Sequence, residues 1–211
     1  EEDKNNYLKN LKIKGKIDYI YNPMESVEIK NCNINSKQIV SVGRLTYQKG
    51  FDMLIDVAKD VLEKNKEYKW LILGDGEDKN RLQEKINKYN LQDRLILKGK
   101  VSNVEDYYKN SSLYVMTSRF EGLPMTLLEA KSYKMPIVSF DCPTGPSEII
   151  RNNINGYLVK ANDIKEMSNK VNSVLLDDKK LKKFSDKAEL DIDKFNINSI
   201  INKWTNILCT I

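Results

Sequence analysis

The 211-residue sequence contains no histidine, and this absence removes several classes of active site at once. Ser/His and Cys/His triads are excluded, so acid–base chemistry is left to carboxylates, lysine, arginine and tyrosine. Cysteine is also scarce, with three residues at positions 32, 142 and 209. They are far apart and lack metal-site spacing, which together with the missing histidine excludes zinc and favours a reducing cytoplasm.

Long apolar runs are absent as well, since no stretch approaches the roughly 18 residues that a membrane-spanning helix needs. The net charge is +5, but the lysines are scattered along the chain. Scattered lysines are typical of a solvated surface, so we expect no nucleic-acid partner. The chain opens with EEDKNN, without an initiator methionine or a signal peptide, which predicts a piece of a longer protein.

What the sequence does contain, from residue 37 onward, is a regular alternation of short apolar runs and amphipathic stretches. The runs predict strands over 38–43, 68–74, 94–99, 112–118, 136–140 and 156–159. The stretches predict helices over 51–65, 78–90, 103–110, from Pro124 and over 146–151, then a helical tail beyond Asn162 with breaks near Asp177 and Asp193. This order indicates an α/β, Rossmann-like, doubly wound parallel sheet of about six strands with a helical carboxyl-terminal tail.

The first 36 residues do not follow this alternation. KIDYIYNP, 16–23, is interpreted as a strand that ends at Asn22-Pro23, and the polar residues after it as a linker. We therefore assign 1–36 to the remnant of a preceding domain and a linker, and 37–211 to one domain with its tail. The last helix, around Trp204, is expected to expose apolar surface that packs across an interface in the full protein.

The segment SRFEGLPMTLLEA, 118–130, joins a predicted strand to a predicted helix and carries two carboxylates. In open α/β sheets, ligands bind beyond the carboxyl ends of strands, near helix amino termini. Glu121 falls in that crevice, while Glu129 lies one to two turns into the helix among core residues. Gly122 permits the turn, and Pro124 is expected at the first helical position.

Two further connections end at the same edge. GRLTYQKG, 43–50, offers Arg44 and Lys49, which can both reach one phosphate group, without the Gly-Lys-Ser/Thr of a Walker loop. GDGED, 74–78, lets backbone N–H groups approach an anion through Gly74 and Gly76. It does not complete the dinucleotide motif, so nicotinamide binding is not expected.

These pieces, in this order, resemble the carboxyl-terminal half of the group 1 glycosyltransferases, a retaining family with two facing Rossmann-like domains called the GT-B fold. The resemblance covers roughly 16–208. The matching segments are YNP at 21–23, SVGRLTYQKGFD at 41–52, LILGDGED at 71–78, SRFEGLPMTLLEA at 118–130, PIVSFDCPTGPSEII at 136–150 and NGYLV at 155–159. One departure is Lys134, where the family usually has a glycine.

The resemblance implies roles for the charged residues. The cationic pair Arg44 and Lys49 would hold the donor's diphosphate, Glu121 would face the donor sugar, and Glu129 would bind the ribose hydroxyls. We therefore assign Glu121, Arg44 and Lys49 to catalysis. The candidate substrate-binding residues are Glu129, Gly122, Leu123, Pro124, Gly74, Gly76 and Val101.

The function implied is that of the donor-binding half of a glycosyltransferase. It would move a hexose or N-acetylhexosamine from a UDP-sugar to a glycan or lipid-linked acceptor in surface-polysaccharide assembly. We expect no cofactor and no metal beyond the UDP-sugar substrate, and an acceptor held by a missing amino-terminal domain. The isolated chain should bind donor without transferring sugar. A cytoplasmic location is expected, with peripheral association at the inner face of the membrane left open for the full protein.

Two other classes stay open at this point. One is a non-catalytic nucleotide or sugar-phosphate binding module, and an upstream domain with an acceptor cleft would decide against it. The other is a nucleotide-sugar epimerase, which would convert its ligand with no acceptor present. A glycoside hydrolase fits poorly, because such enzymes hold both carboxylates at one sugar carbon.

Overall fold

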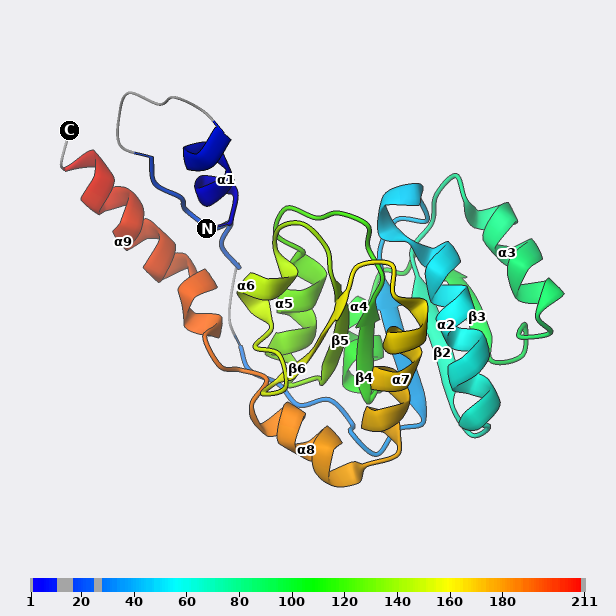
Figure 1. The fold of residues 1–211 in the computed structure, drawn as a ribbon. Coiled ribbons are helices and arrows are strands. Elements are labelled where there is room, and N and C mark those ends of the chain that lie inside the picture. The colour runs from blue at the N-terminus through cyan, green and yellow to red at the C-terminus, as the bar shows by residue number, and fades with distance from the viewer. Residues whose placement is uncertain (1, 11–16, 25–27, 210–211) are drawn as a thin grey trace.

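The computed structural model describes residues 2–10, 17–24 and 28–209. At its centre lies a six-stranded sheet in which all neighbours run parallel, in the order β3-β2-β1-β4-β5-β6 (Figure 1). The strands are β1 (Gln38–Val42), β2 (Lys69–Leu73), β3 (Leu95–Gly99), β4 (Leu113–Met116), β5 (Ile137–Asp141) and β6 (Gly156–Lys160). The order reverses direction between β1 and β4, so the predicted doubly wound sheet is confirmed.

Helices cover both faces of the sheet. Their bounds are α1 (Glu2–Asn10), η1 (Tyr47–Lys49), α2 (Phe51–Lys64), α3 (Lys79–Lys88), α4 (Val104–Lys109), α5 (Met125–Ser132), α6 (Pro146–Ile149), α7 (Ile164–Leu175), α8 (Asp178–Asp186), η2 (Ile192–Phe195) and α9 (Ile197–Leu208). One apolar cluster joins α2, α3, α7 and α8 to one face, and a second joins α4, α5, α6 and η2 to the other. The predicted helical tail, with breaks near Asp177 and Asp193, is confirmed.

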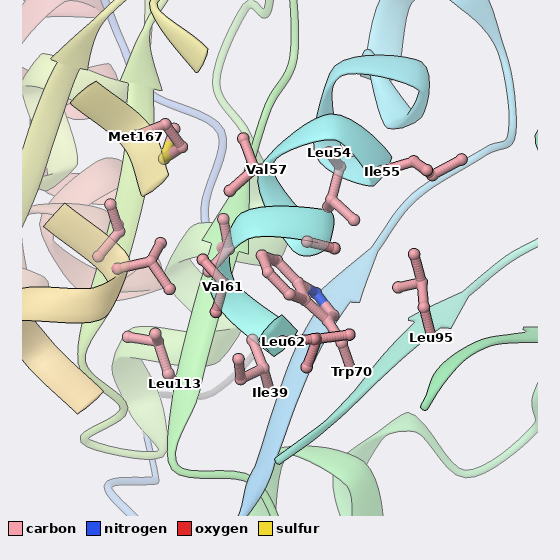
Figure 2. Close-up of a cluster of buried hydrophobic side chains, with 14 of the residues drawn as sticks. Ile39, Leu54, Ile55, Val57, Val61, Leu62, Trp70, Leu95, Leu113 and Met167 are labelled. Carbon is pink, nitrogen blue, oxygen red and sulfur yellow. The ribbon is translucent and has the colours of Figure 1, made fainter. Parts of the chain in front are cut away.

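The apolar stripe of α2 explains why this helix lies against the sheet. Leu54, Val57 and Val61 recur at helical spacing and pack in one cluster with Ile39 and Trp70 (Figure 2). The indole is fully buried, so its N–H needs an acceptor, which is Ser41 Oγ at 3.0 Å. Ser41 in turn donates to the Val115 carbonyl at 2.6 Å. This chain of hydrogen bonds ties β2, β1 and β4 together beneath the site.

The predicted strand over 16–23 is wrong. Within the described residues 17–24 there is no strand, and Met24 forms only an isolated bridge to Asn196. The aromatic residues that suggested a strand are used in ring contacts instead, since Tyr21 packs against Tyr19 and Phe195 with ring centroids 5.2 and 4.8 Å away. Tyr21 is therefore packed on η2 and is not part of a sheet.

Part of the segment interpreted as a linker is hydrogen-bonded to the domain. Backbone N–H groups of Lys30 and Cys32 donate to carbonyls of Ser132 and Tyr133, at 2.8 and 2.7 Å. The assignment of 1–36 to a preceding domain stays a prediction.

The last helix, α9, extends away from the sheet, alongside the amino-terminal residues (Figure 1). Ile201, Trp204 and Leu208 are 51%, 52% and 65% exposed, so the expected apolar surface is present. Lys203 lies over the Tyr19 ring at 4.9 Å and links α9 to the segment before the domain. In the described part of the chain no helix combines the length and apolarity needed to cross a bilayer.

Two glycines at the ends of neighbouring strands have different surroundings. Gly74, after β2, has a φ of +139°, and a Cβ there would lie 1.9 Å from the Gly43 carbonyl oxygen. Gly99, at the end of β3, has a φ of +73°, but a Cβ there would meet nothing within 4 Å. Close approach of two connecting loops therefore depends on Gly74 and not on Gly99.

We predict that Gly74→Ala lowers the free energy of unfolding by at least about 3 kcal/mol, because backbone must move to accept the methyl group. Gly99→Ala is the matched control and should cost only about 1 kcal/mol, the penalty for a positive φ. Urea unfolding of both variants measures the difference. Equal losses would mean that the close approach at Gly74 is not a constraint on the fold.

Candidate functional site

The carboxyl ends of the strands carry the predicted site residues. Arg44, Gly74 and Val101, which follow β1, β2 and β3, line one hollow of about 410 Å³. The remaining lining residues are Val42, Gly43, Leu73, Asp75, Lys100 and Val104. Arg44 is exposed and forms no ion pair within the described residues. Its guanidinium is therefore available to an anion that enters this hollow.

Glu129 lies in a neighbouring hollow of about 560 Å³, and Val104 lines both spaces. Tyr108, on α4, donates its hydroxyl hydrogen to Glu129 Oε2 at 2.8 Å. Burial raises the pKa of the Tyr108 hydroxyl well above its usual value, and the nearby Tyr114 and the Glu129 carboxylate raise it further. Tyr108 thus remains a proton donor that fixes one carboxylate oxygen, and the sequence alone did not indicate this partner.

Lys49 follows β1 and Glu121 follows β4, the two strands between which the strand order reverses. Their side chains form an ion pair. Lys49 Nζ lies 2.7 Å from Glu121 Oε1, and Ser118 Oγ donates to the same oxygen at 2.6 Å. The Glu121 side chain is 6% exposed and that of Lys49 is 20% exposed. A carboxylate this buried requires its cation, so the two side chains predicted from separate motifs form one unit.

A second ion pair links the start of α2 to the loop after β4. Arg119 Nη1 and Nη2 contact the two oxygens of Asp52 at 2.9 and 2.6 Å, and the guanidinium lies 4.1 Å from the Tyr47 ring centroid. Burial opposes ionisation of Asp52, but the hydrogen bonds and charge of Arg119 outweigh it and hold the pKa of this carboxyl below its usual value. The pair lies 67 positions apart in sequence, and our sequence analysis missed it.

The loop after β5 closes on the Glu121 segment. Thr144 donates its hydroxyl to the Glu121 carbonyl, and a Cβ on Gly145 would lie 2.4 Å from the Gly122 carbonyl oxygen. Burial, followed by the charge of Glu121, raises the pKa of the Cys142 thiol to about 12. Cys142 therefore remains a neutral thiol beside the carboxylate.

The turn into α5 differs from prediction at one residue. Pro124 is the N-cap of α5, with φ −72° and ψ 95°, rather than its first helical residue. The pyrrolidine ring fixes φ but leaves ψ free, so the sequence could not distinguish these positions. Gly122 is exposed, Leu123 half-buried and Pro124 buried, all within the loop that carries Glu121.

The backbone N–H groups of the glycine turn after β2 already have acceptors within the protein. Gly74 N–H donates to the Gly99 carbonyl at 2.9 Å, and Gly76 N–H donates to Asp75 Oδ1 at 2.9 Å. This last contact, followed by Lys79, holds the pKa of Asp75 below its usual value. Gly76 also approaches the Leu45 carbonyl so closely that a Cβ would lie 2.4 Å from the oxygen. A ligand role for Gly74 and Gly76 stays a prediction.

Together these groups place two cations and two carboxylates along one edge of the sheet. Arg44 and Lys49 can neutralise a phosphate group, while Glu121 and Glu129 can accept hydrogen bonds from hydroxyl groups. Among the described residues, no three histidine, cysteine, aspartate or glutamate side chains are grouped so that they could hold a metal ion. The arrangement therefore suits a phosphorylated, hydroxyl-rich ligand bound by side chains.

Comparison with known proteins gives the same classification from independent observations. The sequence profile described as "Glycosyl transferases group 1" matches residues 25–191. The chain is 36% identical over 206 residues to the amylovoran biosynthesis glycosyltransferase AmsD of Erwinia amylovora, covering 95% of this chain and 56% of AmsD. It is 32% identical over 195 residues to a poly(ribitol-phosphate) alpha-N-acetylglucosaminyltransferase of Staphylococcus aureus, covering 90% of this chain and 40% of that protein.

A solved structure also shares the fold. The crystal structure of a mutant S. aureus TarM superposes with a TM-score of 0.84 at 29% identity, covering 98% of this chain and 42% of TarM. The chain thus spans about half the length of the relatives that it matches. From the profile match, the identity to AmsD and the shared Rossmann-like sheet, this chain belongs to the group 1 glycosyltransferases of the GT-B fold.

Proposed function

We propose that this chain is the donor-binding domain of a retaining glycosyltransferase. The full protein would move a hexose or an N-acetylhexosamine from a UDP-sugar to a glycan or lipid-linked acceptor in surface-polysaccharide assembly. The observation that carries this proposal is the Lys49–Glu121 ion pair at 2.7 Å, in which Lys49 belongs to the same connection after β1 as Arg44. This contact supports the proposal because the ammonium group could bind a phosphate and the carboxylate could face a sugar.

The names of the related proteins support the sugar class. AmsD is named for amylovoran biosynthesis, and the S. aureus relative for transfer of N-acetylglucosamine to poly(ribitol-phosphate). The TarM structure contains UDP and alpha-GlcNAc-glycerol. A UDP-sugar donor and a surface polymer as acceptor are therefore the first choices to test for this chain.

The chemistry of glycosyl transfer explains why these side chains suit the reaction. Breaking the bond between the sugar and diphosphate develops negative charge on the leaving group and positive charge on the sugar ring. Arg44 and Lys49 would stabilise the diphosphate, while the Glu121 carboxylate would lie beside the sugar. Glu129, held by Tyr108, would bind the ribose hydroxyls. The leaving diphosphate needs no protein acid.

In this proposal Lys49 is already paired with Glu121 before the donor binds. The Lys49 side chain is only 20% exposed, and with Glu121 as its partner its charge is not left unpaired. On donor binding, the ammonium group can contact the diphosphate while it remains near Glu121. Arg44 supplies the second charge from the exposed side.

We predict that Arg44→Ala weakens UDP binding by roughly 1.5 to 3 kcal/mol, the value of a charge-assisted hydrogen bond, without changing stability. The side chain is exposed, so its removal leaves no buried charge. Lys98→Ala, at an exposed lysine on β3 that does not line the hollow, is the control. Calorimetric titration with UDP measures both, and unchanged affinity in Arg44→Ala would remove this residue from the phosphate site.

Lys49→Ala needs a different control, because it leaves the Glu121 carboxylate buried and unpaired. We predict that Lys49→Ala lowers both UDP affinity and stability, whereas Lys49→Ala combined with Glu121→Gln recovers stability but not affinity. Thermal unfolding and calorimetry on the two variants separate these effects. Recovered UDP affinity in the double variant would show that Lys49 does not contact the diphosphate.

The two glutamates should differ in which part of the donor they bind. We predict that Glu129→Gln weakens UDP binding, while Glu121→Gln keeps UDP affinity at or above that of the parent and weakens only the UDP-sugar. Each variant is titrated with UDP and with a UDP-sugar, and a chelator should alter neither titration. Equal losses for both ligands in Glu121→Gln would contradict the assigned roles.

Because the chain spans about half of each relative, we propose that transfer requires a region that these 211 residues do not include. We predict that the chain alone binds UDP-sugar without transferring sugar to a lipid-linked or glycan acceptor. The measurement is acceptor-dependent release of UDP. Release well above the acceptor-free rate would show that the chain carries its own acceptor site.

A further inference from the structure

Thr144, in the loop after β5, has a backbone conformation that its own side chain disfavours. Its φ is +60°, in the left-handed region. Among the described residues, the other non-glycine positions with a positive φ hold asparagine, aspartate or lysine, so Thr144 is the β-branched one. A β-branched residue with a positive φ is a true outlier. Strain of this kind persists only where neighbouring groups hold it, and it is concentrated at functional sites.

The strained residue places its hydroxyl on the segment that carries Glu121. Thr144 Oγ1 donates to the Glu121 carbonyl oxygen. The Glu121 N–H also donates to this loop, at the Pro143 carbonyl, but the distance is 3.5 Å. That distance exceeds the usual range of an N–H···O bond, so the Thr144 hydroxyl forms the stronger of these two contacts. It fixes the peptide group between Glu121 and Gly122.

The residue after Thr144 is held by close packing. Gly145 has a φ of +93°, and a Cβ there would collide with the Gly122 carbonyl oxygen and with Pro124 Cδ. Only glycine therefore fits at this position. The loop after β5 lies directly against the turn into α5, and this contact keeps Thr144 beside its acceptor.

The short helix that follows, α6, is anchored by three other parts of the chain. Tyr21 donates its hydroxyl to the Glu148 carboxylate, and Lys194 Nζ donates to the Glu148 carbonyl. The buried Lys131 donates to the Ile149 carbonyl at 3.1 Å. These donors come from the segment that precedes the domain, from η2 and from α5. Because α6 is held in this way, the strained turn before it is prevented from relaxing by a shift of the whole loop.

A turn by itself does not require threonine at this position. Glycine adopts a positive φ without strain, so it would form the same turn at a lower cost. What threonine adds is the hydroxyl group on the Glu121 carbonyl. The strained conformation therefore maintains one specific contact with the backbone of Glu121.

We propose that Thr144 is a positioning residue for Glu121 in the donor-sugar site. The proposal rests on the proposed donor function, in which Glu121 faces the sugar. Lys49 and Ser118 hold the carboxylate of Glu121, while Thr144 holds its backbone. With both ends of the side chain fixed, the carboxylate loses little freedom when the sugar binds.

Calorimetric titration of the 211-residue chain with UDP, UDP-glucose and UDP-N-acetylglucosamine tests this role. Thr144→Val keeps the shape of the side chain and removes the hydroxyl, whereas Thr144→Ser keeps the hydroxyl. We expect Thr144→Val to weaken UDP-sugar binding by about fivefold, the value of one hydrogen bond, and to leave UDP binding unchanged. Thr144→Ser should bind both ligands like the parent.

Thermal unfolding separates positioning from a structural role. Thr144→Gly removes the hydroxyl and the strain together, so we expect it to unfold at or above the temperature of the parent while it binds the UDP-sugar about fivefold more weakly. A residue that only stabilised the turn would lose stability on this change, with UDP and UDP-sugar binding affected alike. Asn153→Gly is the matched control, because Asn153 is exposed, has a φ of +64° and precedes β6, at the edge where the strands begin.

A double variant tests whether Thr144 acts through Glu121. Glu121→Ala removes the side chain that is positioned, so adding Thr144→Val should weaken UDP-sugar binding no further. Additive losses would overturn the proposal, as would UDP-sugar binding like that of the parent in both Thr144→Val and Thr144→Gly. Either result leaves the donor function standing, because the parent still binds the UDP-sugar. Failure of the parent to bind UDP or a UDP-sugar would overturn the donor function itself, and with it the role of Thr144.

Discussion

The parallel direction of all six strands is the constraint on which the rest of this structure depends. Parallel strands place every carboxyl end at the same edge, so loops from distant parts of the sequence meet there. Between β1 and β4 the order reverses, and the chain leaves β1 toward α2 but leaves β4 toward α5, on the opposite face. Lys49 and Glu121 meet where the two connections diverge.

Two ion pairs lie at this edge, whereas Arg44 forms none within the described residues. The Lys49–Glu121 and Arg119–Asp52 contacts are both partly buried, and in such surroundings a lone charge would be destabilising. Each pair also joins the connection after β1 to the connection after β4. The same interactions therefore hold these two parts of the site together.

The site has two sides that differ in chemical character. On the α4 and α5 side, polar groups and two hollows are present, with Tyr108 directing the Glu129 carboxylate. Before α2, the exposed Tyr47 ring lies against the Arg119 guanidinium.

The sequence alone determined the alternation of strands and helices, the parallel sheet and the edge at which ligands should bind, because period and burial are local signals. It also identified Arg44, Lys49 and Glu121 as charges in the loops that follow strands, and Glu129 on the helix after one of these loops. A resemblance in motifs was enough to indicate the family. It even marked Lys134 as unusual, and this residue has a φ of +50°, a conformation that glycine adopts without strain.

Tertiary structure decided which of these residues touch. Within the described residues 17–23 no strand forms, and Tyr21 packs on Phe195, far along the chain. Arg119 and Asp52 are unremarkable in sequence, and only the fold brings their charges to 2.6 Å. Likewise, the exposure of Tyr47 and Phe120 is a property of the folded surface. Contacts between residues distant in sequence depend on how all the elements pack, and no local pattern contains that information.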